Sequence, residues 1–187
     1  MTEKAAIRAQ IKCLRRELDE TQKRDLDQAV LENLLSLPEL REGTKIPVYC
    51  YVSIGKEADT RALMERLRQR NIPVAVPRVE GDVIRFYLIR GMEDLEPGCM
   101  RIPEPAAGCP PADSGASVVL TPGLAFTPEG ARIGYGGGFY DRFFETEPEH
   151  KRIALAYPFQ ILPKLPAEGF DRQVDMIVTS ERIYHCR

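Results

Sequence analysis

The stretch IPVYCYVSIGKEADTRALMERLRQRNIPVAVPRV, residues 46–79, decides the fold class of this chain. Its two ends, 46–52 and 72–79, are rich in Val, Ile and Tyr and predict two buried strands. Between them, Asp59 and Thr60 are suited to cap a helix, and apolar residues follow at helical spacing. Strands that alternate with helices in this way are typical of an α/β fold with a mainly parallel sheet.

The same alternation continues on both sides of this stretch. Apolar residues at helical spacing predict two helices within residues 1–37, the second capped by Asp19 or Thr21. Pro77 is expected to shorten the second strand, because proline has no N–H for a sheet ladder. Residues 96–115 are rich in Pro, Gly and Ala and predict a long loop. Further strands are expected at 83–89, 117–123, 152–158 and 174–180.

Length and composition narrow the functional classes. The 187 residues are expected to form a single domain, 1–187. The formal net charge of −2, from 26 Lys and Arg against 28 Asp and Glu, argues against a generally basic nucleic-acid binder. No apolar run is long enough to span a membrane, and the charged N-terminus does not resemble a signal peptide. The five cysteines form no CxxC pair, so we expect reduced thiols in a cytoplasmic protein.

The segment GARIGYGGGFYDRFF, residues 130–144, contains closely spaced glycines: Gly134, Gly136, Gly137 and Gly138. A glycine loop that leads into a helix exposes backbone N–H groups, which can cradle a phosphate. It is not a Walker A motif, since no GK[ST] ends it, and Phe139 stands where a GxGxxG fingerprint needs its third glycine. The alternative interpretation is a tight strand-to-helix turn that binds no ligand.

Basic residues recur along the first predicted helix at Lys4, Arg8, Lys12 and Arg15. This basic row borders the apolar face of the helix, so its side chains could reach phosphates on the protein body. The pattern nevertheless favours a solvated helix face. Arg132, just before the glycines, could clamp a phosphate with two hydrogen bonds, although a surface arginine is the commoner interpretation.

Carboxylates follow the first strand and the glycines. Glu57 and Asp59 come after the strand at 46–52, at the sheet edge where open α/β folds bind ligands, although Asp59 is equally explained as a helix cap. Asp141 and Asp175 would suit Mg²⁺ beside a phosphate, or would serve as a helix-start carboxylate or an arginine partner. The chain has only 2 histidines, so a Ser–His–Asp or Cys–His relay is not expected.

The order of these motifs resembles the 5-formyltetrahydrofolate cyclo-ligase family, also called methenyltetrahydrofolate synthetases. The segment TPGLAFTPEGARIGYGGGFYDRF (121–143) is closely similar to the family signature, because it joins a PG turn, an arginine, the glycines and a YDR ending. The resemblance covers nearly the whole chain, with KAAIRAQIKCLRREL (4–18), YVSIGKEADTRALMERL (51–67), IPEP (102–105) and VDMIVT (174–179) in matching places. It implies a three-layer α/β/α sandwich with a mainly parallel central sheet, Rossmann-like in arrangement.

The resemblance also implies roles for individual residues. It implies catalytic roles for Arg132, Lys4 and Tyr140. It implies ATP binding by Lys4, Ala5, Ala6, Ile7, Arg8, Arg132, Ile133, Gly134, Tyr135, Gly136, Gly137, Gly138, Phe139 and Tyr140. It implies folate binding by Ile54, Glu57, Asp59, Tyr135, Gly136, Gly137, Gly138 and Phe139, and Mg²⁺ binding by Asp141 and Asp175. Some members carry Arg where this chain has Tyr135 and Lys where it has Gly137, so a charge found in those members is absent here.

By the same resemblance, the chain would use Mg²⁺ and ATP to convert 5-formyltetrahydrofolate into 5,10-methenyltetrahydrofolate, ADP and phosphate. Phosphorylation of the formyl oxygen would create a leaving group, and the folate N10 would close the ring. The expected partners are these small molecules, with neither nucleic acid nor membrane, and the expected state is a monomer or weak homodimer.

Other functions stay open on the residues alone. A kinase or ligase for another small molecule on the same scaffold would not bind folate. A non-catalytic nucleotide-binding regulatory domain would bind ATP without turnover. An RNA-binding accessory protein would use the basic residues between Lys4 and Arg16 and would bind with strong salt dependence, although the overall acidity disfavours it.

Overall fold

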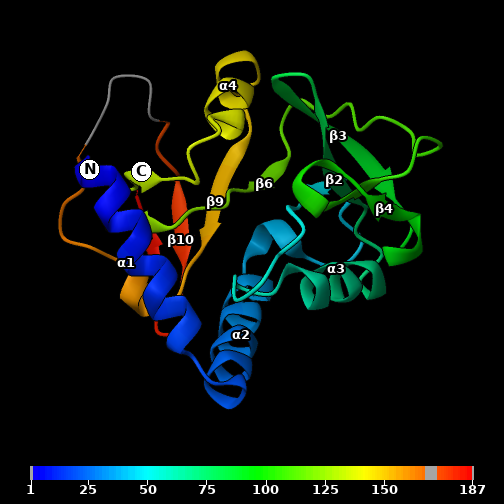
Figure 1. The fold of residues 1–187 in the computed structure, drawn as a ribbon. Coiled ribbons are helices and arrows are strands. Elements are labelled where there is room, and N and C mark those ends of the chain that lie inside the picture. Colours follow the sequence, from blue (N-terminus) through cyan, green and yellow to red (C-terminus); the bar gives the residue numbers. More distant parts are fainter. Residues whose placement is uncertain (1, 167–171, 187) are drawn as a thin grey trace.

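The computed structural model describes residues 2–166 and 172–186. Within them, a seven-stranded sheet has the order β11-β10-β9-β6-β1-β2-β3 (Figure 1). Neighbours from β10 across to β2 run parallel, while the edge strands β3 and β11 run antiparallel to their neighbours. The strands are β1 (Val48–Tyr49), β2 (Val74–Glu80), β3 (Val83–Ile89), β6 (Val118–Leu120), β9 (Lys151–Leu155), β10 (Met176–Val178) and β11 (Ile183–His185). This mainly parallel sheet confirms the predicted α/β fold.

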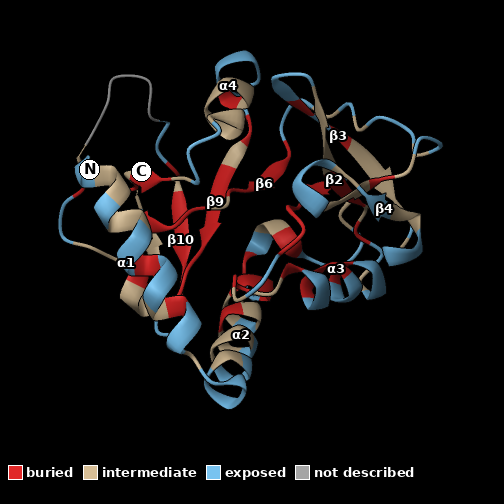
Figure 2. Cartoon of the chain, viewed as in Figure 1, coloured by how far each residue is buried: buried red, intermediate tan, exposed pale blue. Residues whose placement is uncertain are grey.

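Helices cover both faces of the sheet (Figure 1). The α-helices are α1 (Glu3–Glu17), α2 (Glu20–Leu35), α3 (Thr60–Gln69) and α4 (Phe139–Thr146), and the short 3-10 helices are η1 (Pro38–Leu40), η2 (Met92–Asp94), η3 (Cys99–Arg101) and η4 (Pro158–Gln160). Successive strand residues point to opposite faces. Val118 and Leu120 accordingly pack in one core with α2 and α3, whereas Val119 packs in another with Phe144 of α4. Figure 2 shows the buried residues concentrated in the strands and on the inner sides of the helices.

Three of the helices begin at side chains that accept from their first N–H groups, and Thr2 has this role for α1, where its Oγ1 accepts from the Ala5 N–H at 3.3 Å. Asp19, not Thr21, caps α2 and forms a capping box with Gln22, whose N–H donates to the Asp19 carboxylate at 2.8 Å. Asp59 caps α3, and the Arg61 N–H donates to its Oδ1 at 2.8 Å. These caps follow from short polar side chains placed directly before amphipathic segments.

The first predicted strand was too long. Instead of 46–52, the ladder includes only Val48–Tyr49. The Cys50 N–H still bonds to Ala75 of β2, but at Tyr51 and Ser53 the backbone bonds to a side chain, that of Thr60. Thr60 Oγ1 donates to the Tyr51 carbonyl at 2.6 Å and accepts from the Ser53 N–H at 2.9 Å. The extended segment therefore leaves the sheet and becomes a loop at its carboxyl edge.

The prediction that Pro77 shortens the second strand was wrong, because β2 continues through it to Glu80. The Ala75 carbonyl accepts from the Cys50 N–H at 2.8 Å, so odd-numbered positions of β2 direct their backbone groups toward β1. The register of β1 ends where Tyr49 faces Ala75. Pro77 therefore faces a side where no strand continues, and its missing N–H leaves no ladder bond unmade.

The predicted loop at 96–115 contains regular structure. The strands β4 (Leu95–Pro97) and β5 (Pro103–Pro105) form an antiparallel pair there, and Arg78 of β2 donates to the Pro105 carbonyl at 2.7 Å. A second small sheet, β7 (Ala125–Phe126) with β8 (Arg132–Ile133), and the edge strand β11 were also not predicted. Among the described residues, no helix combines the length and apolar character needed to cross a bilayer.

Candidate active site

The glycine loop, residues 134–138, joins β8 to α4 and lies against α1. The Nε of Arg8 donates to the Gly134 carbonyl at 2.9 Å. Gly136 and Gly138 have φ values of +106° and +69°, a region that glycine adopts without strain. Gly138 is also the N-cap of α4, where free N–H groups and the helix dipole favour an anion. This geometry is compatible with both interpretations of the loop, an anion cradle and a strand-to-helix turn.

A cluster of two buried residues, Arg15 and Glu57, and the partly exposed Tyr135 joins α1 to two loops. Arg15 donates to the Tyr135 hydroxyl through Nη1 at 2.5 Å and to the Gly123 carbonyl through Nη2 at 2.9 Å. The Tyr135 hydroxyl donates to Glu57 Oε1, and the other oxygen of Glu57 accepts from the Ile54 N–H at 2.8 Å. Burial, and next the charge of Glu57, raise the pKa of Tyr135. The phenol therefore stays protonated and can donate to the carboxylate.

The acidic loop, residues 53–59, is held on its other side by α2 and by the segment after β9. Asp27 Oδ1 accepts from the Asp59 N–H at 3.1 Å and from the Tyr157 hydroxyl at 2.7 Å. The Tyr157 hydroxyl also lies 3.1 Å from the Glu57 carbonyl oxygen. The two acidic residues that the sequence predicted at this sheet edge thus belong to one fixed loop. Asp59 is in addition the helix cap that the alternative interpretation expected.

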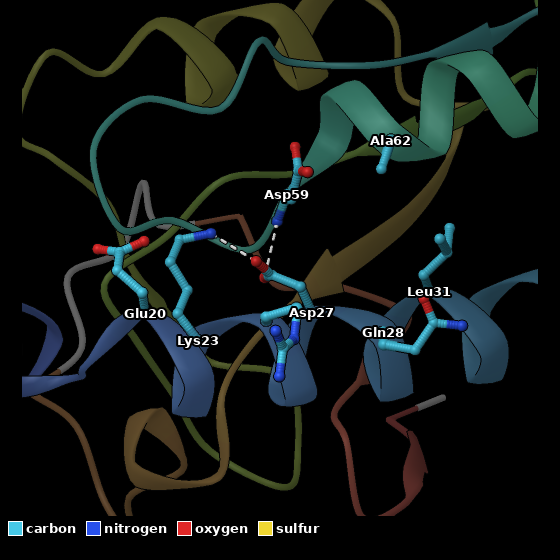
Figure 3. Close-up of a pocket in the computed structure, with 8 residues that line it drawn as sticks. Glu20, Lys23, Asp27, Gln28, Leu31, Asp59 and Ala62 are labelled. Carbon is cyan, nitrogen blue, oxygen red and sulfur yellow. Dashed lines mark hydrogen bonds and ion pairs between the residues drawn. The ribbon is translucent and has the colours of Figure 1, made fainter.

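A pocket of about 230 Å³ opens between α2 and the start of α3 (Figure 3). Glu20, Lys23, Asp27 and Asp59 are among the residues that line it. Lys23 Nζ lies 2.5 Å from Asp27 Oδ2, and Asp27 in turn bonds to the acidic loop, as the dashed lines show. Lys23 in this wall is thus paired with an acidic group, and the other basic lining residue, Arg24, lies 3.5 Å from a carboxylate oxygen of Asp25. The pocket is accordingly part of the surface of the acidic loop and not a separate anion site.

Arg132 and Asp141 form an ion pair at the start of α4, with Nη2 and Oδ1 2.6 Å apart. Their side chains are 5% and 24% exposed. Arg132 also donates to the Pro122 carbonyl at 3.1 Å, and the Arg172 N–H donates to Asp141 Oδ1 at 3.2 Å. The interpretation of Arg132 as a surface arginine was therefore wrong. Asp141 is an arginine partner, which was one of the two interpretations open for it.

Asp175, the second predicted metal ligand, lies directly before β10, and its Oδ2 accepts from the Arg152 N–H at 2.8 Å. The segment just before Asp175 reaches the other predicted metal ligand, because the Arg172 N–H donates to the Asp141 carboxylate. The described part of the chain contains no group of three or more His, Cys, Asp or Glu side chains arranged to hold a metal ion. Any metal held here would therefore need ligands from a bound substrate.

Buried donor atoms without a hydrogen-bond partner among the described residues occur around the glycine loop: Arg15 Nε, Arg132 Nε and Tyr140 OH. Buried polar atoms are normally paired, so such atoms call for a ligand or water. Burial raises the pKa of Tyr140, and its hydroxyl stays protonated as a donor. A ligand rich in oxygen atoms would satisfy these groups.

The solvated face predicted for the basic row of α1 was wrong for Arg8 and Arg15, because both guanidinium groups bond to the protein body. The ammonium of Lys12 lies 5.9 Å from the centre of the exposed Tyr135 ring. Lys4 lies one helical turn before Arg8, on the same face. The structure thus brings the basic row, the glycine loop and the acidic loop together.

Sequence reasoning missed three residues that hold the loops: Arg15 as a buried partner, Asp27 and Tyr157. Their partners lie 120, 32 and 130 residues away along the chain. The position of Tyr157 directly after a predicted strand, at the ligand-binding edge of the sheet, was a usable signal. No sequence pattern near Arg15 or Asp27 indicated that these residues would hold the loops.

Comparison with known proteins relates the whole chain to one family. The model of the 5-formyltetrahydrofolate cyclo-ligase family matches residues 1–180. The 5-formyltetrahydrofolate cyclo-ligase of Escherichia coli K12 is 28% identical over 178 residues, which cover 91% of this chain and 96% of that protein. The Haemophilus influenzae protein of the same name is 31% identical over 173 residues, covering 88% and 91%. The solved structure of Aquifex aeolicus 5,10-methenyltetrahydrofolate synthetase has a TM-score of 0.86 at 31% identity and covers 100% of this chain and 94% of that chain.

Proposed function

The chain belongs to the 5-formyltetrahydrofolate cyclo-ligase family, and on this premise we propose that it converts 5-formyltetrahydrofolate into 5,10-methenyltetrahydrofolate while ATP is cleaved to ADP and phosphate. The observation that carries the proposal is the double attachment of the glycine loop. Arg8 of α1 bonds to Gly134, and the next residue, Tyr135, bonds to Glu57 of the acidic loop. The groups proposed for ATP and those proposed for the folate therefore meet at two consecutive positions.

The chemistry of a formamide explains why both substrates must meet. Its carbon is a poor electrophile, because the nitrogen lone pair is delocalised into the carbonyl. Transfer of the γ-phosphoryl group to the formyl oxygen breaks the bond to ADP and turns that oxygen into a leaving group. The folate N10 then attacks the formyl carbon, loses its proton and closes the ring as phosphate departs. This sequence depends on positioning and charge neutralisation more than on a histidine base.

The phosphate side of the reaction has the cations and donors that it needs. Lys4 and Arg8 lie one turn apart on α1, and Arg8 already touches the glycine loop. Arg132 Nε and the Tyr140 hydroxyl are both buried, and neither has a hydrogen-bond partner among the described residues. We assign Lys4 and Arg132 to the transferring phosphoryl group, and Tyr140 to a substrate oxygen. The other residues proposed for ATP contribute backbone and shape: Ala5, Ala6, Ile7, Ile133, Gly134, Gly136, Gly137, Gly138 and Phe139.

Mg²⁺ fits Asp141 better than Asp175. The Asp141 carboxylate is 24% exposed and offers the hard oxygen ligands that Mg²⁺ prefers. Its partner Arg132 is itself a proposed phosphate ligand, so the carboxylate and the guanidinium form a pair that a metal–phosphate group could divide. Both carboxylates accept a backbone N–H, Asp141 from Arg172 and Asp175 from Arg152, so the preference for Asp141 rests on its pairing with Arg132. A metal held by Asp141 would add positive charge on the ATP phosphates.

The folate side combines apolar surface with a fixed carboxylate. Ile54 and Tyr135 are 43% and 41% exposed, and both bond to Glu57, so two accessible apolar surfaces lie beside one fixed carboxylate. A flat heterocycle is typically bound by apolar walls with a few precisely placed polar groups. We therefore propose that Ile54 and Tyr135 line the folate site and that Glu57 and Asp59 fix its orientation.

The test is a spectrophotometric assay of the purified protein with 5-formyltetrahydrofolate, ATP and Mg²⁺, in which each component is omitted in turn. We expect the absorbance of the methenyl product only when all three are present. Binding of Mg-ATP without product would refute the proposal and would favour a nucleotide-binding regulatory protein. ATP cleavage that does not depend on the folate would be hydrolysis, with water as the phosphoryl acceptor, and would also refute the proposal.

A further inference from the structure

Arg15 links four separate segments of the chain through one guanidinium group. It lies on α1 and donates to Gly123, in the turn after β6, and to Tyr135 in the glycine loop. Tyr135 donates to Glu57, which accepts the Ile54 N–H within the acidic loop. The path from the turn after β6 to the acidic loop thus runs through hydrogen bonds of side chains, with Arg15 at its centre.

The burial of this cluster makes its geometry costly to change. The side chains of Arg15 and Glu57 are 9% and 8% exposed, and Nη1 lies 3.9 Å from Oε1. Two buried opposite charges stabilise each other only while both stay in place, since either charge alone would be buried without compensation. The Tyr135 hydroxyl bonds to both of them, so its position is fixed by the same pair.

The remaining surroundings of Tyr135 do little to hold it. It stands between Gly134 and Gly136, in a backbone with a φ of +106° at Gly136, and its side chain is 41% exposed. The cations of Lys12 and Arg15 lie 5.9 and 6.0 Å from the ring centre, while the two hydrogen bonds of the hydroxyl tie the side chain to Arg15 and Glu57. A side chain without an acceptor, such as arginine, could not accept from Arg15 here, whereas the tyrosine hydroxyl both accepts from Arg15 and donates to Glu57. The bridge is thus a property of this chain's own tyrosine.

We propose that Arg15 is a positioning residue which, through Tyr135, holds the acidic loop against the glycine loop, so that nucleotide bound at one loop raises the affinity of the other for the folate. This rests on the proposed function, because it takes the two loops as the ATP and folate sites. Coupling between sites requires an element whose arrangement both ligands favour. The Arg15–Tyr135–Glu57 cluster is such an element, since it belongs to both loops.

The experiment measures the dissociation constant of 5-formyltetrahydrofolate by calorimetry, with and without Mg²⁺ and the non-hydrolysable ATP analogue adenylyl imidodiphosphate. The ratio of the two constants is the coupling factor. The variants are Tyr135→Phe, which removes one hydroxyl from an exposed side chain, Arg15→Met and Arg15→Lys. Arg16→Met is the matched control, because Arg16 is an exposed arginine on the same helix.

We expect the coupling factor to fall by about tenfold in Tyr135→Phe and in Arg15→Met, as the loss of a hydrogen bond to a charged group implies. Arg15→Lys should have an intermediate effect, because an ammonium keeps the charge but lacks the planar fork that reaches both Gly123 and Tyr135. Arg16→Met should keep the factor of the unmodified protein.

An unchanged coupling factor in Tyr135→Phe would overturn the proposal. So would a lower melting temperature in Arg15→Met with an unchanged factor, which would make Arg15 a purely structural residue. Each variant is also tested in the omission assay described above. If the unmodified protein forms no methenyl product, the proposed function itself fails, whereas normal turnover with an unaltered coupling factor in the variants refutes only the role of Arg15.

Discussion

Removal of one partner of the Arg132–Asp141 pair tests whether this pair links stability to catalysis. In Arg132→Met, Asp141 loses the guanidinium 2.6 Å away. Its carboxylate still accepts from the Arg172 N–H, and its side chain is 24% exposed to water. Breaking a buried pair commonly costs about 3–5 kcal/mol, and the partial exposure of Asp141 lowers the expected cost of this variant below that range, to about 2–3 kcal/mol. In Asp141→Asn, the stranded charge belongs to Arg132, which is only 5% exposed, so we expect about 3 kcal/mol.

The double variant Arg132→Met/Asp141→Asn separates the two roles of the pair. It leaves neither charge stranded, so its free energy of unfolding should lie within about 2 kcal/mol of the unmodified protein and not at the sum of the single losses. Turnover should fall by at least about 100-fold in all three variants, because the phosphate clamp and the metal ligand are then absent. Urea unfolding and the methenyl assay measure the two quantities. Additive stability losses, or a double variant that retains turnover, would refute this account.

Three further predictions concern the fold and the ATP site. Burial lowers the pKa of His150 below its ordinary value of 6.5, so the unfolded chain takes up the proton first as the pH falls. The stability due to the neutral ring is thus present above about pH 6.5 and lost below it. Urea unfolding at a series of pH values between about 7 and 5 should show a free energy of unfolding that depends less on pH in His150→Asn than in the unmodified protein. Gly130→Ala should cost about 2–3 kcal/mol in thermal unfolding, because φ is +94° and a Cβ would lie 2.4 Å from a backbone carbonyl. Gly108→Ala, with nothing within 4 Å, should stay within about 1 kcal/mol. Lys4→Ala should raise the KM for ATP about tenfold at an unchanged melting temperature, whereas a lower melting temperature with normal kinetics would indicate a structural role.

Features that depend on a few neighbouring residues could be predicted from the sequence. The helix caps at Asp19 and Asp59 need only a carboxylate and an N–H two or three residues later. The fold class followed from apolar runs, and the structure explains why. Val118, Val119 and Leu120 are all buried because helices cover both faces of the sheet. The prediction of a ligand site near the glycine loop likewise rested on local backbone freedom.

Features that depend on where another segment ends could not be predicted. Pro77 is tolerated in β2 only because β1 ends two residues earlier in register. Arg15 could not be distinguished from the exposed Arg16 beside it, since the difference lies in partners such as Tyr135, 120 residues away. The role of Asp27 could not be predicted for the same reason. Its carboxylate lies on a helix, and the Asp59 N–H that it accepts from lies 32 residues away along the chain.

The attachment of α1 has a consequence for protein synthesis. The side-chain contacts of Arg8 and Arg15 reach Gly134, Tyr135 and Gly123, which follow in the chain after 126, 120 and 108 residues. A ribosome adding roughly 5–20 residues per second needs about 5–25 seconds to produce those partners after α1 has been made. An isolated helix of this length is only marginally stable in water. The helix α1 is therefore translated well before the residues that it packs against, and a nascent chain interrupted before residue 135 cannot have assembled the site.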